Sequence, residues 1–169
     1  NPDLAFLKAN ENQGTKMEPT VTWVGHSTVL VQMGGLNILT DPIFSDRASP
    51  IPWLGPKRAQ APGLTLEQLP HIDVVLISHN HYDHCDQVSL LALDKQTGAP
   101  PIFLVPLGLG KWLNKIGIRN TVELDWWQNH KIAGSDFVFT PVQHWSGRSL
   151  TDRMKTLWGG FAVFAPDFH

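Results

Sequence analysis

The sequence predicts an α/β fold in a single domain spanning residues 1–169. Three observations lead to this prediction. Strand-like apolar runs alternate along the chain with segments of helical character, which is typical of layered α/β architectures. Residues 73–78 (DVVLIS) form a continuous apolar run between polar ends, as expected of a strand buried on both faces of a sheet. A chain of 169 residues has room for one domain with its own core.

The N-terminal part predicts an extension, three strands and a long loop. Residues 1–19 are expected to form an N-terminal extension. The segments VTWV, STVLVQM and LNILT between residues 20 and 40 are rich in β-branched residues and predict strands, the last two joined at a Gly34-Gly35 turn. Residues 41–63 contain five prolines, which remove backbone donors, so we expect a long irregular segment there. Long loops within compact domains are usually functional.

The rest of the chain predicts alternating helices and strands. Thr65 and Gln68 have the spacing of a capping box for a short helix that Pro70 ends. QVSLLAL and GLGKWLNKIG predict helices, the second closed by Gly117. Four further segments predict strands: IFLVP, TVEL, FVFTP and GGFAVFAP.

Composition and charge exclude several classes of protein. The chain is 42% apolar and 17% charged, so a disordered chain is excluded. Its formal net charge of −2 gives no bulk attraction for phosphates, and no nucleic-acid partner is expected. The single cysteine, Cys85, excludes a secreted fold with internal disulfides. The sequence has neither a signal peptide nor an apolar run of membrane-spanning length, and we expect a location in the cytoplasm or peripheral to a membrane.

The strongest functional signal directly follows the apolar run 73–78. The sequence HNHYDH at residues 79–84 places three imidazoles and one carboxylate within six residues. On an extended backbone His79 and His81 project to the same side and can bind one ion, while Asp83 and His84 turn toward a second position. Sites in α/β sheets form beyond the carboxyl ends of strands, so this placement favours a site for two metal ions over a polar surface loop.

Residues elsewhere in the chain are candidates to complete this site. His144 follows a predicted strand in FVFTPVQHWSGR and is the expected third ligand of the first ion. Asp41 ends another strand, where it either holds a ligating histidine by its second ring nitrogen or caps a turn before Pro42. His26, in WVGHST, is either a pocket residue or a buried histidine bonded to the backbone.

Aromatic residues near these candidates suggest a pocket. Trp53 in the proline-rich loop and Trp145 beside His144 are candidates to line an apolar path for acyl chains, and Tyr82 lies within the HNHYDH sequence as a further pocket residue. The remaining residues of these types are interpreted structurally. Surface or loop positions are expected for His71 and His130, and core positions for Trp126 and Trp127.

Two clustered cations would give this site hydrolytic chemistry. Together they lower the pKa of a shared water toward about 7 and neutralise charge on an oxyanion. Histidine and aspartate ligands without a thiolate cluster favour zinc, with manganese and iron as alternatives.

The quoted motifs resemble a known family. HNHYDH is an instance of the HxHxDH motif of the metallo-β-lactamase superfamily. The blocks WVGHST, LTDPIFSDRASP, GPKR, LISHNHYDHCD, VPLGL, ELDWW, FVFTPVQHWSGR and LWGG resemble its N-acylphosphatidylethanolamine-hydrolysing phospholipase D branch. This resemblance implies an αβ/βα sandwich, a dinuclear zinc site, and hydrolysis of a lipid phosphodiester by a hydroxide held by the two ions. It also implies that His79, His81 and His144 hold one zinc, and that Asp83 and His84 hold the other. Asp83 is then the catalytic residue that orients the nucleophile or takes its proton.

The sequence departs from that family in one respect. The family has a bridging aspartate after its FAVFAP-type strand and a last histidine ligand far downstream, and neither is present here. We therefore expect the first half of the sandwich or slightly more, belonging to a longer enzyme. A sheet built to meet a second half leaves an apolar face exposed, so the missing C-terminal half or a homo-oligomer partner is expected to cover it. The resemblance further implies a small-molecule or phospholipid substrate and peripheral contact with a membrane.

Two other functions remain open from the sequence. The same dinuclear site opens cyclic esters, so a lactonase acting on sugar-phosphate or similar lactones is one alternative. The missing ligands make a non-catalytic metal-binding module the other. A nuclease is disfavoured because no basic stripe is present.

Overall fold

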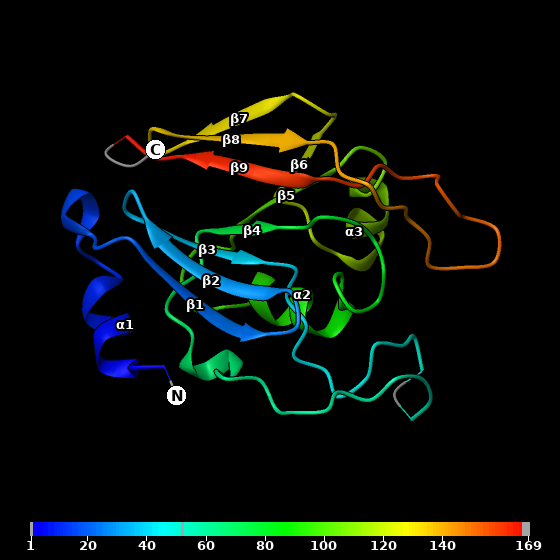
Figure 1. Cartoon of the computed structure of the whole chain (residues 1–169), viewed down its shortest axis with the longest axis horizontal. Coiled ribbons are helices and arrows are strands. Elements are labelled where there is room, and N and C mark those ends of the chain that lie inside the picture. Colours follow the sequence, from blue (N-terminus) through cyan, green and yellow to red (C-terminus); the bar gives the residue numbers. More distant parts are fainter. Residues whose placement is uncertain (1, 52, 167–169) are drawn as a thin grey trace.

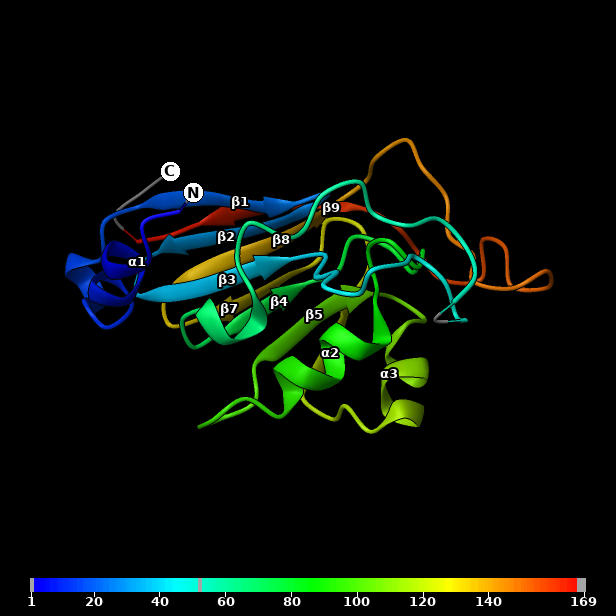
Figure 2. The ribbon, with the colours of Figure 1, turned by 90° about the horizontal axis from the view of Figure 1, so that it is seen from below.

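The computed structural model describes residues 2–51 and 53–166 and confirms the α/β prediction. Pro52, one of the five prolines of the predicted loop, lies outside the described residues. The chain forms three layers: two helices, a six-stranded sheet and a three-stranded sheet (Figures 1 and 2). The six-stranded sheet is therefore covered on both faces.

The six-stranded sheet has its strands in the order of the sequence. Its strands are β1 (Thr20–Gly25), β2 (Thr28–Met33), β3 (Leu36–Thr40), β4 (Val74–Leu76), β5 (Ile102–Pro106) and β6 (Thr121–Leu124). The first three strands pair antiparallel through tight turns, and β3 to β6 pair parallel. The carboxyl ends of β3, β4 and β5 therefore meet at one edge. The strand predicted over 73–78 is shorter than expected and spans Val74–Leu76, although the N–H of Ile77 still donates to the Leu104 carbonyl of β5 at 3.0 Å.

The second sheet is antiparallel and consists of β7 (Asn129–Ile132), β8 (Ser135–Thr140) and β9 (Gly160–Phe164). His130, expected at a surface or loop position, is a half-buried residue of the edge strand β7 and pairs with Phe137 of β8. The segment NHKI has only one apolar residue and alternates between exposed and half-buried positions, so it carries no clear strand pattern. Pairing with β8, and not local propensity, makes it a strand.

Three α-helices accompany the sheets: α1 (Leu4–Asn10), α2 (Gln87–Asp94) and α3 (Gly110–Ile116). Two 3₁₀ turns are η1 (Gly14–Lys16) and η2 (Leu66–Gln68), and η2 carries the predicted capping box. Gly117 closes α3 in the left-handed conformation, as its position predicts. The helix α1 falls in the predicted extension, and its Leu7 is 3% exposed in the main core. This part of the N-terminal segment is therefore packed onto the sheet.

The core lies on both faces of the six-stranded sheet. Alternation along β3 sends Leu39 toward the helices and Ile38 toward the second sheet. Cys85 is fully buried on the helix side. The expectation that Trp126 and Trp127 are core residues is wrong for Trp127. That residue is 71% exposed and lies in a turn with a positive φ of 70°.

The two sheets leave open space between them. A cavity of about 380 Å³ lies between β2, β3, β4 and β9, and most of its lining residues are apolar. At one end it reaches Asp41 and Ser78, which follow β3 and β4. None of the helices in the described part of the chain combines the length and apolar character needed to cross a membrane.

Candidate metal centre

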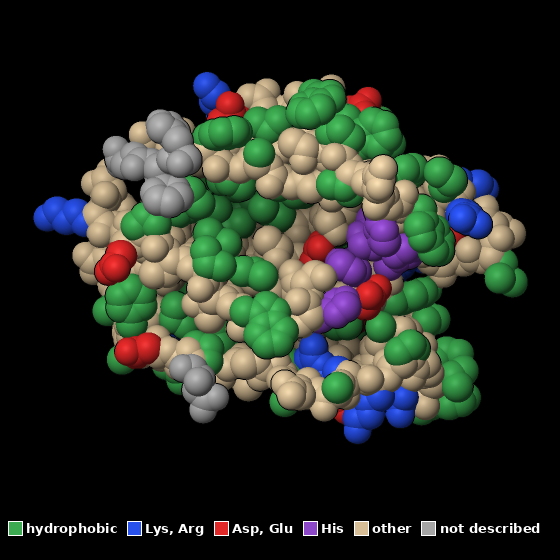
Figure 3. All heavy atoms as spheres, in the orientation of Figure 1, with side chains coloured by type: hydrophobic (Ala, Val, Ile, Leu, Met, Phe, Trp, Pro, Cys, Tyr) green, Lys and Arg blue, Asp and Glu red, His purple; other side chains and the backbone are tan. Residues whose placement is uncertain are grey.

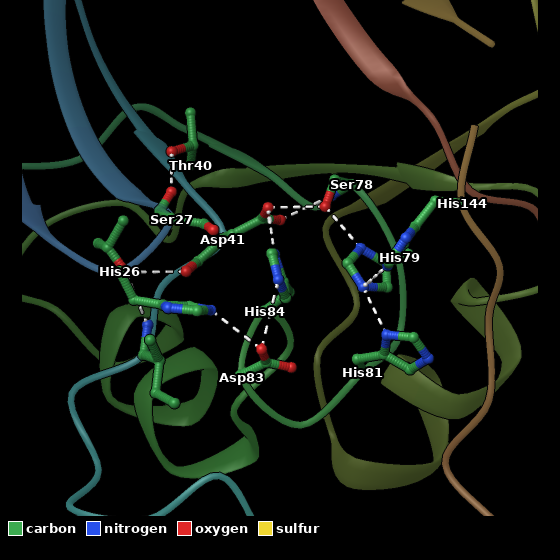
Figure 4. A network of polar contacts seen from close by, with 12 residues as sticks. His26, Ser27, Thr40, Asp41, Ser78, His79, His81, Asp83, His84 and His144 are labelled. Atoms are coloured by element: carbon green, nitrogen blue, oxygen red, sulfur yellow. Dashed lines mark hydrogen bonds and ion pairs between the residues drawn. The ribbon is translucent and has the colours of Figure 1, made fainter. Parts of the chain in front are cut away.

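The candidate metal ligands gather at the carboxyl edge of the parallel strands. Asp41 directly follows β3, and the HNHYDH segment begins three residues after β4 ends. His26 lies in the turn between β1 and β2, and His144 follows β8 of the second sheet. Segments from both sheets thus meet in one place, and Figure 4 shows their side chains pointing toward one another.

The first cluster consists of His79, His81 and His144, three residues that the sequence predicts to share an ion. The Nε2 atom of His79 lies 2.8 Å from Nδ1 of His81 and 3.0 Å from Nε2 of His144. One nitrogen from each ring lies within 4.8 Å of the other two. His79 is 3% exposed, so this group of nitrogens reaches below the surface.

Hydrogen bonds fix the tautomer of His79. A carboxylate only accepts, so the single hydroxyl proton of Ser78 goes to Oδ2 of Asp41, at 2.6 Å. The Ser78 oxygen must then accept from Nδ1–H of His79, at 2.8 Å. The lone pair of His79 is therefore on Nε2 and faces His81 and His144. Burial and the charges of His84 and His81 also lower the pKa of His79 to about 3, which keeps the ring neutral.

The second cluster consists of Asp83, His84 and His26. Their donor atoms also lie within 4.8 Å of one another, with Nε2 of His26 at 2.9 Å and Nε2 of His84 at 3.5 Å from Oδ2 of Asp83. The other ring nitrogen of His84 donates to Oδ2 of Asp41, at 2.9 Å. That bond leaves Nε2 of His84 with its lone pair toward the cluster. The structure thus places His26 beside Asp83 as a third donor, a position that the sequence left open.

The charges around the second cluster favour a cation. Burial raises the pKa of Asp83, but the His84 charge and hydrogen bonds outweigh it, so the net shift is downward and the carboxylate is anionic at neutral pH. For His84, burial lowers the pKa, but the hydrogen bond and charge of Asp41 raise it by more than burial lowers it. The net shift of the His84 pKa is therefore upward. This imidazole is therefore held beside two carboxylates.

These residues fit divalent metal ions. His81 Nε2 is a buried polar atom without a hydrogen-bond partner among the described residues, and its other nitrogen faces two imidazoles. Imidazole nitrogens of His81 and His144 that lie 2.8 and 3.0 Å from Nε2 of His79 approximate the ligand spacing of a tetrahedral ion with metal–nitrogen bonds of about 2.0–2.1 Å. The two clusters could each hold one ion, with His79, His81 and His144 at one and Asp83, His84 and His26 at the other.

Arg148 connects the two segments that carry the first cluster. Its guanidinium donates to the backbone carbonyls of Asn80 and Cys85, at 2.8 and 2.7 Å, and lies 4.1 Å from the ring centre of Tyr82. The hydroxyl of Tyr82 donates back to the Arg148 carbonyl, at 2.9 Å. The HNHYDH segment is thereby fixed to the segment that follows His144. Tyr82 therefore helps to hold the HNHYDH segment to the segment after His144, and it also lines the large cavity.

A large cavity opens beside both clusters. It measures about 920 Å³, and its lining includes His26, His81 and Asp83 from the clusters together with Tyr82 and Trp145. Figure 3 shows the histidines in a hollow of this face, with hydrophobic side chains around it and basic side chains close by. The proline-rich segment supplies much of the opposite wall through residues 43–48 and 56–63. The expectation for Trp53 is wrong, because this residue is 76% exposed and lies outside the lining.

Sequence reasoning missed two residues that shape the site. Ser78 donates to Asp41 and accepts from His79, whereas the sequence pattern indicates only that it ends a strand. Arg148 donates to the carbonyls of Asn80 and Cys85, which its place in FVFTPVQHWSGR does not indicate. A hydroxyl directly before the first histidine, and an arginine four residues after His144, are the signals that were available.

Comparison with known proteins identifies the family. A family model described as a beta-lactamase superfamily domain matches residues 36–168. The chain belongs to the beta-lactamase superfamily. The resemblance carried by HNHYDH is thereby confirmed. A metallo hydrolase structure of this fold, from Ignicoccus hospitalis, covers 88% of the chain with a TM-score of 0.62 at 22% identity, and the chain covers 57% of that protein.

Two relatives within the beta-lactamase superfamily match most of the chain. An uncharacterized protein of Mycobacterium tuberculosis is 42% identical over 97% of this chain and 44% of its own length. The N-acyl-phosphatidylethanolamine-hydrolyzing phospholipase D 1 of Caenorhabditis elegans is 41% identical over 84% of this chain and 42% of its own length. The chain thus spans less than half the length of these relatives.

Proposed function

We propose that the protein is a metal-dependent hydrolase that cleaves a phosphodiester of the N-acylphosphatidylethanolamine type, with two zinc ions held by its histidine clusters. The observation that carries this proposal is the pair of adjacent three-donor clusters on the wall of one large cavity. The 41% identity with the phospholipase D of Caenorhabditis elegans supports the choice of substrate.

Each of the two metal ions would be held by a separate group of three residues. His79, His81 and His144 would hold the first ion, and Asp83, His84 and His26 the second. Bound there, the ions would supply Lewis-acid chemistry, lowering the pKa of a water toward about 7 and neutralising charge on a phosphoryl oxygen. Asp83 is the catalytic residue, because its anionic carboxylate faces the cavity and can orient the attacking water or take its proton.

The cavity wall suits an amphiphilic substrate. Trp145 packs edge-on against His81, with ring centres 4.3 Å apart, and places apolar surface next to the first cluster. Trp23 lines the same cavity and is 66% exposed. We propose that these side chains contact acyl chains and that the protein meets its phospholipid at a membrane surface. The apolar space between the two sheets is the place where we expect a further segment or a second copy to pack.

A substrate comparison tests the proposal. The purified protein is loaded with zinc and given N-acylphosphatidylethanolamine in mixed micelles, and phosphatidic acid and N-acylethanolamine are measured by mass spectrometry. Metal content is measured in parallel for the His81→Ala variant. We expect turnover, and loss of both turnover and about one bound ion in His81→Ala. The matched control is His71→Ala, which removes a histidine outside the clusters and should change neither.

Other outcomes separate the alternatives. Hydrolysis of a sugar-phosphate lactone without cleavage of the phosphodiester would establish the lactonase instead. Stoichiometric metal binding without turnover of either substrate would favour the non-catalytic module. A preparation that binds manganese or iron more tightly than zinc would change the assignment of the ion while keeping the site.

A further inference from the structure

Arg58 lies in the wall of the cavity that the metal clusters also line. Its backbone is well fixed, because its N–H donates to the Asp46 carbonyl at 2.9 Å and the preceding residue pairs with Arg47 in a short bridge. The bridge joins the two halves of the proline-rich segment, at Arg47 and Lys57. The backbone of Arg58 is therefore held in place, and this residue forms part of the cavity wall.

The guanidinium of Arg58 has fewer acceptors than donors. Its only hydrogen bond in the described part of the chain runs from Nη2 to the Ile43 carbonyl, at 3.3 Å, which is long. The Nε and Nη1 atoms are buried without partners, so three of its five N–H donors are unsatisfied. Within residues 2–51 and 53–166 no carboxylate lies within 4.0 Å of it. Arg58 as a whole is half-buried, but buried donor atoms of a cation without acceptors are unfavourable, and such a group is expected to have a ligand.

The surroundings leave room for that ligand. Gly25 lines the same cavity, and a Cβ placed on it would lie 3.9 Å from Nη2 of Arg58. Because Gly25 has no side chain, the space beside the guanidinium stays open. One long hydrogen bond is a weak restraint on a long side chain, so a small rotation turns the unsatisfied donors into the cavity.

We propose that Arg58 is a binding residue for the substrate's phosphate oxyanion and makes the cavity selective for anionic diesters over neutral esters. This inference rests on the proposed function, which supplies the phosphodiester. A guanidinium forms paired, charge-assisted hydrogen bonds with phosphate oxygens, which a neutral ester cannot accept equally well. Lys57 lines the same cavity, but its side chain is exposed and its Nζ atom lies 4.0 Å from Oδ2 of Asp46, so it has no unsatisfied buried donor to offer. It provides a matched control with the same charge.

Phosphate binding tests the inference without any catalytic activity. Inorganic phosphate is titrated into protein freed of metal by EDTA, and saturation is followed by tryptophan fluorescence, with Trp23 and Trp145 lining the cavity. Arg58→Met should raise the Kd for phosphate at least tenfold, Arg58→Lys less, and Lys57→Met less than twofold. Equal phosphate binding by wild type and Arg58→Met, or no saturable binding by wild type, would overturn the inference.

Kinetics with one leaving group separate this inference from the proposed function. The zinc-loaded protein is assayed with bis(p-nitrophenyl) phosphate, which is anionic, and with p-nitrophenyl acetate, which is neutral. Arg58→Met should raise KM for the diester tenfold or more with kcat within threefold, and leave the acetate unaffected. An unchanged KM in an active enzyme refutes the role of Arg58 alone. Absence of diester cleavage by wild type refutes the proposed function, and the phosphate titration still decides the role of Arg58.

Thermal stability distinguishes ligand binding from a structural role. Because the guanidinium makes a single long hydrogen bond, Arg58→Met should not lower the Tm of the metal-free protein in phosphate-free buffer. Phosphate should raise the Tm of wild type and leave that of Arg58→Met unchanged. A large loss of Tm in both Arg58→Met and Arg58→Lys would show that Arg58 is needed for folding, and would overturn the inference.

Discussion

Replacing Asp41 by asparagine should weaken both metal sites at once. The carboxylate accepts from Ser78 and from Nδ1 of His84 through the same oxygen, Oδ2. An amide nitrogen at that place donates instead. Ser78 would then turn its proton to Nδ1 of His79, and His84 would accept on Nδ1. Both rings would carry their proton on Nε2, where a metal needs a lone pair.

The opposite orientation of the amide in Asp41→Asn is also unfavourable. Placing the amide oxygen at the Oδ2 position puts the NH₂ group against the backbone N–H of Ser78, which donates to Oδ1 at 2.7 Å in the wild type. Two donors would then face each other in a site where Asp41 is 6% exposed. Loss of such an orienting partner typically costs a factor of about 10 to 100 in metal affinity, or about 1.4 to 2.8 kcal/mol for each ion.

Competition with a chromophoric zinc chelator measures both affinities, and circular dichroism checks the fold. The control is Asp73→Asn, which removes the same charge and affects a single backbone bond, from Asn37 N–H at 2.7 Å, at the start of β4. This control should bind both ions as the wild type does. If Asp41→Asn keeps both affinities within twofold while remaining folded, the tautomer argument is wrong.

Three further predictions concern stability. The pKa of His79 falls from 6.5 to about 3 on folding, so between these pH values the unfolded chain binds a proton on this ring that the folded chain does not. The metal-free protein should therefore lose stability as pH falls from about 6.5 to 3. His79→Asn should flatten this pH dependence of the free energy of unfolding, measured by urea titration. Arg148→Met removes two charge-assisted bonds to the carbonyls of Asn80 and Cys85, so urea denaturation should show a loss of about 3–6 kcal/mol, and a loss below about 1 kcal/mol would contradict this role. Gly159→Ala places a Cβ against the Phe139 ring and the Thr140 carbonyl and should lower stability by about 1–3 kcal/mol, seen as a lower Tm; an unchanged Tm would mean that β9 shifts freely.

The sequence predicted those parts of the fold whose local pattern agrees with their final environment. The buried strand β4, the helices α2 and α3, and the glycine that ends α3 all carry patterns that extend over several residues. The segment NHKI of β7 and the helix α1 carry no such pattern. They are held by partners distant in sequence, β8 for the first and the core around Leu7 for the second.

The candidate site divides in the same way. The spacing of HNHYDH determines that His79 and His81 join one group of donor atoms and that Asp83 and His84 join a second, adjacent group, because these relations depend on a few consecutive backbone angles. Which distant residues join them is decided by the packing of the two sheets. The sequence does not decide whether His26 is a pocket residue or a buried histidine, and it gives no role to Arg58 in GPKR. Neither residue has a local feature that points to the cavity.

The sequence by itself therefore determined the class of fold, the family, and the segment richest in metal-binding side chains. The tertiary structure alone decided that one carboxylate, Asp41, serves histidines of both clusters, and that a guanidinium with unsatisfied donors lies in the cavity wall beside them. The physical reason is the range of the interactions. Periodicity and spacing act over a few residues, whereas tautomers, burial and unsatisfied donors depend on atoms that only the packed sheets bring within 3 Å.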